Sequence, residues 1–352
     1  MKYNIVCLPG DGIGPEITKA VISVLNTIGK RFDHEFCIQE YLIGGTAIDQ
    51  FGTALPDETL AACKNADAIF LAAIGGPKWD RSSVRPEQGL LKLRSELGVY
   101  ANIRPLTVYP KLQSASPLKP EILQGTDFII VRELTGGIYF GDKKRCHEST
   151  INEYATDECK YSVKEITRIA KVAFDLAMQR NKKLTSVDKA NVLETSKLWR
   201  KVVTEMGKRD YPEIELHHQL VDSCAMKLIQ SPSEFDVILT ENMFGDILSD
   251  EASVLAGSLG LLASSSVGGK HGLFEPIHGS APDIAGKGIA NPYASILSIA
   301  MMLRWLKLVG EATAVERATS KAIEKGILTV DLQPESKVTT KQVIEAVVNR
   351  II

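Results

Sequence analysis

Short apolar runs alternate with longer stretches of helical periodicity along this chain, and this alternation restricts the folds it can adopt. Residues 3–8 form an apolar run that ends at a Pro-Gly pair, and residues 15–28 then repeat apolar side chains at helical spacing. Residues 68–73 form another apolar run, which ends at a Gly-Gly pair. Apolar runs of this length between helical stretches are typical of buried strands. The pattern therefore predicts an α/β fold.

The same alternation continues toward the carboxyl end of the chain. It predicts further strands at residues 128–132, 184–187 and 235–239, and further helices at residues 164–179, 196–206, 244–256 and 296–308. Residues 143–161 lack a clear helical period and are expected to form an extended arm. Residues 268–292 are rich in Gly and Pro, so we expect a long ordered loop there, of the kind that is usually functional.

Length and charge exclude several classes of protein. The 352 residues correspond to roughly two domains at about 150 residues per domain. The 41 Lys and Arg residues nearly balance the 43 Asp and Glu residues, which leaves a net charge of −2. This balance argues against a nucleic-acid or membrane-surface role that depends on bulk charge. Any charged site must therefore be local.

Cysteine usage points to a reducing compartment. None of the six cysteines forms a C-x-x-C pair, and zinc-type spacing is absent. No apolar run approaches the roughly 20 residues that a membrane span requires. Free thiols in a chain of this kind are typical of the cytosol, so we expect a cytoplasmic protein.

One predicted helix carries a face suited to a branched anionic ligand. Glu87, Leu90, Leu91 and Arg94 have the spacing that places side chains on one helical face. Two leucines between a carboxylate and a guanidinium would fit a ligand with an apolar branch and a carboxylate. The alternative is an amphipathic surface helix with a solvated arginine.

Two further arginines lie near predicted strand ends. Arg104 precedes a proline, and Arg132 ends an apolar run. Together with Arg94 they could hold an anionic substrate, because guanidinium binds carboxylate bidentately. Scattered arginines are more often surface residues, and their spacing alone does not distinguish the two cases.

Asp246 and Asp250 lie four residues apart in a predicted helix and therefore share one face. Like charges at this spacing repel, and a divalent cation would remove the repulsion. Oxygen ligands favour Mg²⁺ or Mn²⁺. Asp222, which follows a short strand-like run, is a further candidate ligand. The alternative is a solvated acidic helix face.

Tyr139 and Lys189 are candidates for acid–base chemistry. Tyr139 follows a Gly-Gly pair, and Lys189 follows a predicted strand. A lysine beside a metal has a lowered pKa and can act as a base. Either residue taken alone would more often be structural.

The glycine-rich turn at residues 10–14 is not a dinucleotide fingerprint. Its spacing is G-x-G-x-G rather than G-x-G-x-x-G, and no acidic residue ends a second strand in the expected place. The chain also contains no P-loop motif and no G-x-S-x-G motif. These absences exclude P-loop nucleotide-binding proteins and α/β-hydrolases.

Several of these segments together resemble the isocitrate/isopropylmalate dehydrogenase family, the decarboxylating β-hydroxyacid dehydrogenases. The resemblance runs from residue 10 to about residue 332. The most specific segments are residues 90–94, 131–141, 188–192, 242–250 and 278–284.

The resemblance implies a two-domain α/β/α sandwich that is not a Rossmann domain. The first domain would consist of residues 1–99 and 257–352, and the second of residues 100–256. Members of the family are homodimers, in which residues 143–161 would form the dimer arm. Lys189 and Asp222 would reach the active site of the partner subunit.

The resemblance also implies NAD as cofactor, seated on residues 268–291. The implied contacts are Glu275, His278, Gly279, Ser280, Ala281, Asp283, Ile284 and Asn291. The carboxylate of Asp283 would repel a 2′-phosphate, which favours NAD over NADP.

The implied reaction is the oxidative decarboxylation of 3-isopropylmalate in leucine biosynthesis. Asp222, Asp246 and Asp250 would hold one Mg²⁺ or Mn²⁺, with Asp222 also near the substrate. Lys189 would take the hydroxyl proton and Tyr139 would protonate the product carbon, while Arg94, Arg104 and Arg132 hold the carboxylates. Glu87, Leu90, Leu91 and Val192 would line the substrate pocket, the last three around the isopropyl group.

Two alternatives remain within this family. Isocitrate or homoisocitrate carries a third carboxylate where 3-isopropylmalate has its isopropyl group. Leu90 and Leu91 would leave that charge unpaired and desolvated, which is costly. A catalytically silent regulatory subunit would lack one of the catalytic or metal-binding residues, and this chain has all of them.

Overall fold

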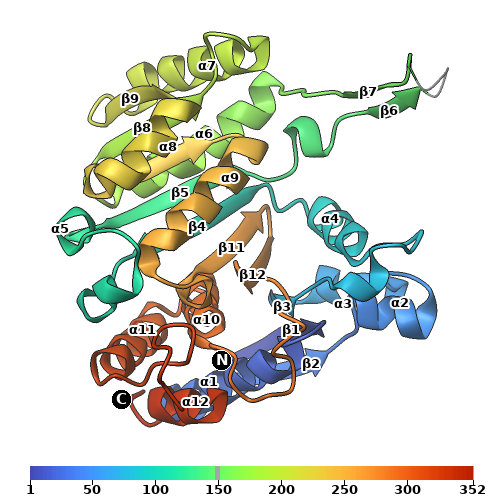
Figure 1. Ribbon diagram of the computed structural model, residues 1–352, viewed down its shortest axis with the longest axis vertical. Helices are drawn as coiled ribbons and strands as arrows, with labels where there is room; N and C mark the ends of the chain where they lie inside the picture. The colour runs from blue at the N-terminus through green and yellow to red at the C-terminus, as the bar shows by residue number, and fades with distance from the viewer. Residues whose placement is uncertain (147–150, 352) are drawn as a thin grey trace. The chain divides into compact units, whose positions relative to one another are not determined.

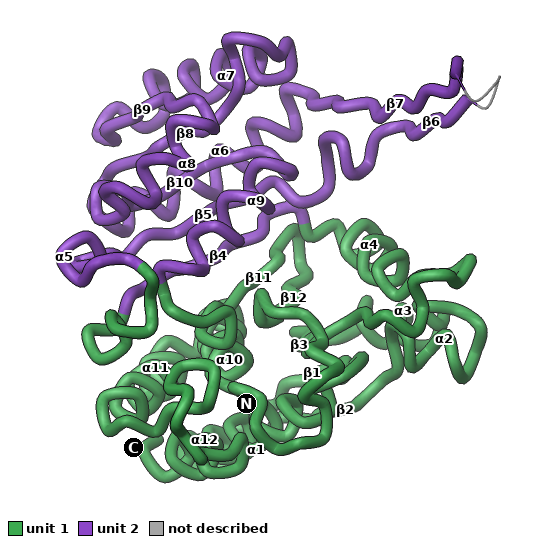
Figure 2. The backbone as a smooth tube through the Cα atoms, viewed as in Figure 1, with its two compact units in different colours: residues 1–99, 109–117, 256–352 green, residues 100–108, 118–255 purple. Residues whose placement is uncertain are grey.

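The computed structural model describes residues 1–146 and 151–351. Contacts divide the chain into two compact units, coloured separately in Figure 2. Unit 1 consists of residues 1–99, 109–117 and 256–352, and unit 2 of residues 100–108 and 118–255. The sequence prediction placed residues 109–117 in the second domain. They group with unit 1, where Ala115 packs so closely against Gly257 that an added Cβ would lie 2.8 Å from it.

Unit 1 is built from both ends of the chain. Its strands follow the order β2-β1-β3-β12-β11, with β11 antiparallel to β12 and the others parallel. Its elements are β1 (Lys2–Gly10), α1 (Gly14–Phe32), β2 (Glu35–Glu40), α2 (Gly45–Phe51), α3 (Asp57–Asn65), β3 (Ala68–Ala73), η1 (Pro77–Trp79), α4 (Pro86–Leu97), η2 (Pro110–Ala115), η6 (Leu259–Leu261), β11 (Ala263–Gly268), β12 (His271–Pro276), α10 (Tyr293–Trp305), α11 (Val309–Glu324) and α12 (Thr340–Val348).

Helices cover both faces of the unit 1 strands. Val6 and Leu8 of β1 belong to one apolar cluster with Leu93 and Leu97 of α4. Successive strand residues point to opposite faces, so the buried Ile5 faces the other side. Helices α1, α10 and α12 pack together there (Figure 1). Unit 1 is therefore an α/β/α layer structure.

Unit 2 repeats this plan with its own strands, in the order β4-β5-β10-β8-β9. β4 is antiparallel to β5, and the other four are parallel. Its elements are β4 (Ala101–Thr107), α5 (Pro120–Leu123), β5 (Asp127–Glu133), η3 (Gly137–Tyr139), β6 (Lys143–Cys146), β7 (Tyr154–Asp157), α6 (Val163–Met178), β8 (Lys183–Asp188), α7 (Glu194–Asp210), β9 (Glu215–Leu220), α8 (Val221–Gln230), η4 (Pro232–Glu234), β10 (Val237–Thr240) and α9 (Asn242–Ser253), followed by η5 (Val254–Ala256) at the boundary.

The register of unit 2 brings distant residues to one edge. Thr240 of β10 pairs with Arg132 of β5 on one side and with Val187 of β8 on the other. These three parallel strands therefore end together, and the segments that follow them begin at the same edge. α6 packs against α7, and α8 packs against α9.

The predicted α/β fold and each predicted strand and helix are confirmed, with boundaries that shift by a few residues. The prediction of one loop over residues 268–292 is partly wrong, because His271–Pro276 form β12 against β11. This strand is short and contains Gly and Pro, so its sequence does not predict a strand. It is recognised from its pairing with β11 and β3. In the predicted arm, β6 pairs with β7 antiparallel, and residues 147–150 lie outside the described residues. Within residues 1–146 and 151–351, no helix is both long and apolar enough to cross a membrane.

Candidate active site

The candidate site in unit 2 lies where β5 ends and α9 begins. Arg132 is the penultimate residue of β5, and α9 starts two residues after β10. The carboxylate of Glu241 caps α9 by accepting a hydrogen bond of 2.7 Å from the backbone N–H of Phe244. The cap places Asn242, Asp246 and Asp250 on successive turns of one helix, as their spacing predicts.

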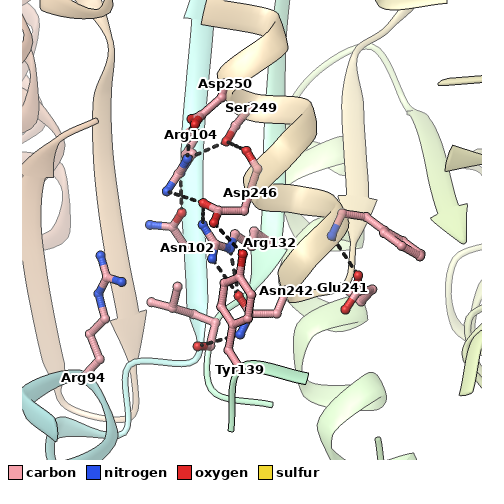
Figure 3. A network of polar contacts seen from close by, with 12 residues as sticks. Arg94, Asn102, Arg104, Arg132, Tyr139, Glu241, Asn242, Asp246, Ser249 and Asp250 are labelled. Carbon is pink, nitrogen blue, oxygen red and sulfur yellow. Dashed lines mark hydrogen bonds and ion pairs between the residues drawn. The ribbon is translucent and has the colours of Figure 1, made fainter. Parts of the chain in front are cut away.

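Arg132 is almost fully buried, with a relative exposure of 4%. Its Nε and Nη2 donate to the Asn242 side-chain oxygen at 3.0 and 2.7 Å, and its Nη1 donates to Asp246 Oδ1. Tyr139 donates from its hydroxyl to the other carboxylate oxygen of Asp246 at 2.8 Å. Figure 3 shows these side chains around Asp246. We call the group Arg132, Tyr139, Asn242 and Asp246, together with Arg104, the arginine centre.

Arg104 joins the centre from β4. Its Nε donates to the Asn102 oxygen at 2.6 Å, and its Nη1 donates to the Ser249 hydroxyl. Its guanidinium also lies 4.0 Å from an oxygen of Asp246 and 3.9 Å from one of Asp250 (Figure 3). Two of the three arginines predicted to bind carboxylates therefore converge on two of the three aspartates predicted to bind metal.

The charges in this centre set the protonation of its members. Burial raises the pKa of Asp246, but the charge of Arg132 and the Tyr139 hydroxyl outweigh it, so the net pKa lies below the ordinary value. Burial raises the pKa of Asp250 more than Arg104 lowers it. Burial and the hydrogen bond to Asp246 raise the pKa of Tyr139 to about 12. Tyr139 is therefore a neutral phenol with a proton to donate.

Lys189 and Asp222 form a pair of their own. Asp188 at the end of β8 pairs in register with Leu220 at the end of β9, so the residues that follow are close. Lys189 Nζ donates to Asp222 Oδ1 at 2.6 Å, and this bond lowers the pKa of Asp222. Much of the Asp222 side chain is exposed, at 60%. The two residues therefore contact each other directly within one chain, and their roles in catalysis and metal binding remain predictions.

Two carboxylates at the arginine centre could contribute to a metal site. Asp246 and Asp250 supply oxygen donors beside each other, which is the donor chemistry that Mg²⁺ and Mn²⁺ favour. Among the described residues, no group of three His, Cys, Asp or Glu comes together in a way that could hold an ion. One chain thus supplies two of the predicted ligands in one place, while Asp222 pairs with Lys189.

In unit 1, Arg94 pairs with a predicted cofactor residue. Its Nη2 lies 2.6 Å from Oε1 of Glu275, and both side chains are mostly buried. Arg94 is on α4, whose buried face is formed by other residues, including Leu93 and Leu97. Leu90 is partly buried against the core and Leu91 is exposed. The predicted ligand face of Glu87, Leu90, Leu91 and Arg94 thus lies beside the packed face of this helix.

In unit 1, one buried carboxylate to which the sequence patterns assigned no role holds the start of α2 and the loop after β3. Asp11 is buried and accepts hydrogen bonds of 2.8 to 2.9 Å from the backbone N–H groups of Gly45, Thr46 and Gly75. Gly12, with a φ of +59°, lies so close to Ser280 that an added Cβ would be 2.0 Å from its carbonyl oxygen. We call Asp11 and its three donors the Asp11 cage.

The segment after β12 contains a buried histidine nitrogen that could bind a nucleotide. His278 Nδ1 lies 2.9 Å from the Gly279 carbonyl, so Nδ1 carries the proton and Nε2 is an acceptor. That Nε2 is buried and has no hydrogen-bond partner. Burial lowers the pKa of His278, which keeps it neutral. A donor such as the amino group of adenine would satisfy Nε2, so the residues fit the predicted cofactor.

The other predicted cofactor residues surround this histidine in the chain. Ser280 donates to the Gly75 carbonyl at 2.7 Å, and its own carbonyl accepts from Ile13 N–H at 2.8 Å. Asn291 is buried and donates to Asp331 at 3.0 Å. Gly279 and Asp283 are exposed, whereas Ala281 and Ile284 are half-buried. Val192, predicted to contact substrate, is exposed in unit 2.

Sequence reasoning missed the neutral residues of the centre. Asn102, Asn242 and Ser249 each bind one of the two buried arginines there. A buried arginine needs acceptors, but nothing in the local sequence says which amide supplies them. The signal available was the place of Asn242 at the start of the segment 242–250, one of those that carry the family resemblance.

The chain is similar to known proteins along nearly its whole length. A sequence model of the isocitrate/isopropylmalate dehydrogenase family matches residues 4–347. The chain is 54% identical to the 3-isopropylmalate dehydrogenase of Geobacillus kaustophilus, covering 98% of this chain and 95% of the relative. It is 52% identical to that of Aquifex aeolicus, covering 99% and 97%.

Solved structures with similar folds include an isocitrate dehydrogenase from Methylococcus capsulatus. The identity is 37% and the TM-score 0.88, with 99% of both chains covered. A β-decarboxylating dehydrogenase from Thermococcus kodakarensis is 36% identical with a TM-score of 0.82, covering 99% of this chain and 96% of the other.

Proposed function

The chain belongs to the isocitrate/isopropylmalate dehydrogenase family, and we propose that it oxidises and decarboxylates 3-isopropylmalate to 2-oxo-4-methylpentanoate with NAD, a step of leucine biosynthesis. The observation that carries the proposal is the arginine centre, where two buried guanidinium groups and a neutral phenol surround Asp246. Relatives named 3-isopropylmalate dehydrogenase, matched along nearly their whole length, support the same substrate.

The arginines bind the substrate in this proposal. Arg94, Arg104 and Arg132 would hold the two carboxylates through charge-assisted hydrogen bonds. Arg104 and Arg132 are oriented in advance by Asn102 and Asn242, so little entropy is lost when substrate binds. Their burial also strengthens the attraction to an anion.

Proton transfers fall to Lys189 and Tyr139. Lys189, with Asp222, would accept the proton of the substrate hydroxyl during oxidation. Tyr139 holds its proton because its pKa is raised to about 12. It would donate that proton to the carbon from which CO₂ departs. A positioned acid or base of this kind typically contributes about 10²- to 10⁴-fold in rate.

Two groups from outside the chain complete the site. Asp246 and Asp250, with Asp222 from a second copy of the chain, would hold Mg²⁺ or Mn²⁺, which supplies Lewis-acid polarisation of the substrate oxygens when bound. His278, Asn291 and the residues between them would hold NAD, which accepts the hydride when bound. The exposed carboxylate of Asp283 disfavours the additional phosphate of NADP.

A homodimer follows from the same proposal. The Lys189–Asp222 pair is partly exposed, and the donor set for a metal is incomplete within the described part of one chain. Met226 of α8 and Ile247 of α9 are also exposed, at 57% and 58%, on helices that pack together. A second copy would cover these apolar side chains and bring in Lys189 and Asp222. The six free thiols suit the reducing cytoplasm, where we place the enzyme.

A substrate panel tests the function directly. Purified enzyme with Mg²⁺ or Mn²⁺ is assayed for kcat/KM on 3-isopropylmalate, isocitrate and tartrate, each with NAD and with NADP. We expect 3-isopropylmalate with NAD to be preferred, because Leu90 and Leu91 offer no partner for a third carboxylate. Equal or faster turnover of isocitrate would refute the substrate assignment.

Replacing Lys189 tests the mechanism. Lys189→Ala removes the proposed base, and we expect kcat to fall by more than about tenfold. A smaller loss would show that another group takes the hydroxyl proton. Lys197→Ala, which removes an exposed lysine from a surface ion pair with Glu194 in the same unit, is the matched control and should leave kcat unchanged.

A further inference from the structure

Asn242 connects two parts of the arginine centre through one side chain. It is completely buried, with a relative exposure of 0%. Its oxygen accepts from Arg132 at 3.0 and 2.7 Å, and its nitrogen donates to the carbonyls of Leu134 and Gly136 at 3.2 and 2.9 Å. Those carbonyls belong to the segment that leads from β5 to Tyr139. Asn242 therefore holds both the arginine and the loop that carries the tyrosine (Figure 3).

The surroundings of Asn242 hold it in one position. Its backbone N–H donates to the Tyr161 hydroxyl at 3.0 Å, and that hydroxyl donates to Glu241 at 3.1 Å. The Tyr139 loop packs on the same tyrosine, since an added Cβ on Gly137 would lie 2.3 Å from the Tyr161 oxygen. Hydrogen bonds of both its backbone and its side chain therefore hold Asn242 in place.

The chemistry of this position requires a carboxamide. Arg132 needs an acceptor, whereas the two carbonyls need donors. An ionised aspartate would satisfy Arg132 but place an oxygen against the two carbonyls, and a leucine would satisfy none of them. In a buried site each unpaired polar group is costly. Only a side chain with a donor at one end and an acceptor at the other satisfies all four contacts.

We propose that Asn242 is a positioning residue for the decarboxylating reaction, fixing the direction of the Arg132 guanidinium and the placement of Tyr139 together. This inference rests on the proposed function of the arginine centre. Asn242 is too deeply buried to touch substrate and acts through its two neighbours. With it in place, Arg132 Nη1 and the Tyr139 hydroxyl meet at Asp246. Without it, both groups can shift, and a shift of about 1 Å can cost up to about 100-fold in rate.

The test compares Asn242→Asp and Asn242→Leu with a control at Asp236. Asp236 is a buried polar residue of the same unit that accepts from Arg180 at 2.7 Å and from the Asn181 N–H at 3.0 Å, away from the centre. We expect kcat/KM for 3-isopropylmalate to fall about 10- to 100-fold in both Asn242 variants. The KM for NAD should stay within about twofold, and Asp236→Asn should change neither value although it lowers the melting temperature.

A double-mutant cycle separates positioning from a general loss of structure. Interacting residues give non-additive losses. In a Tyr139→Phe background, Asn242→Asp should therefore cost less than about threefold in kcat/KM, because an aspartate still accepts from Arg132 and the hydroxyl whose placement it disturbs is already gone. The same loss in both backgrounds, a matching loss in Asp236→Asn, or a raised KM for NAD would overturn the proposal. If Asn242→Leu does not fold, Asn242→Asp decides by the same criteria.

The wild-type panel keeps this result separate from the proposed function. If the enzyme oxidises isocitrate rather than 3-isopropylmalate, the substrate assignment fails. The cycle is then run with isocitrate, whose carboxylates make the same demand on Arg132. Non-additivity there still supports the role of Asn242, and additivity refutes it.

Discussion

The Asp11 cage of unit 1 and the arginine centre of unit 2 are both built around a carboxylate, but the partners differ in kind. Asp11 is 1% exposed, and its oxygens accept three backbone N–H groups, two from the first residues of α2 and one from the loop after β3. The Asp246 side chain is 37% exposed, and its partners are the side chains of Arg132, Tyr139 and Arg104. Asp11 is hydrogen-bonded to the main chain, whereas Asp246 is paired with side chains that can change partners.

Because their partners differ, the two carboxylates are expected to serve different ends, Asp11 the stability of the fold and Asp246 the activity of the enzyme. The backbone donors cannot leave Asp11 unless the chain segments that carry them move. We therefore infer that this carboxylate stabilises the fold. Side-chain donors around Asp246 can turn toward a substrate carboxylate without disturbing any strand or helix. We therefore expect substitutions in the Asp11 cage to lower the free energy of unfolding, and substitutions in the arginine centre to lower the reaction rate.

The largest expected effect is on stability. Asp11→Ala leaves three buried N–H donors without an acceptor, at about 1 to 3 kcal/mol each. The free energy of unfolding, measured by urea denaturation, should fall by about 3 to 6 kcal/mol. A loss below about 1 kcal/mol would mean that water replaces the carboxylate and that the cage is not structural.

Asp246→Asn is the matching substitution in unit 2. It removes the charge that Arg132 and Arg104 face and a proposed metal ligand, so kcat/KM should fall by at least about 10³-fold. The unfolding free energy should change by less than about 1 kcal/mol, since the carboxylate is partly exposed. A variant that keeps its activity but unfolds easily would reverse the comparison.

Removing one hydroxyl from the arginine centre gives a smaller loss. Tyr139→Phe removes the proposed proton donor and should lower kcat for 3-isopropylmalate by about 10²-fold. Its unfolding free energy should stay within about 0.5 kcal/mol of wild type, as for most substitutions outside the core. Tyr154→Phe, at an exposed tyrosine of β7, serves as the control for the ring substitution.

The smallest expected effect is a pH dependence in unit 1. Burial holds the pKa of His278 below its ordinary value of about 6.5. The unfolded chain then binds the proton more readily, so stability is full above about pH 6.5 and decreases as the pH falls below it. His278→Gln should flatten this decrease between about pH 6.5 and pH 5, by less than about 2 kcal/mol. Identical pH profiles for variant and wild type would show that His278 is not shielded.

Local patterns predicted the parts of the molecule that depend on residues close in the chain. The strand at Ala68–Ala73 and the shared helix face of Asp246 and Asp250 follow from periodicity alone. Arg104, Arg132, Tyr139, Lys189 and the aspartates were candidates because of their residue types, and the family resemblance assigned their roles. The strand β12 was missed because its pairing with β11 and β3, rather than its composition, makes it a strand.

By itself, the sequence determined the order of strands and helices and the chemical groups available to a site. The tertiary structure decided which groups meet, because strand order and register are not encoded in local periodicity. Arg132 meets an amide 110 residues away, Arg94 meets a carboxylate 181 residues away, and Asp11 binds a loop 64 residues further on. The physical reason is burial: a buried charge must be paired, and only the folded chain shows which partner is within reach.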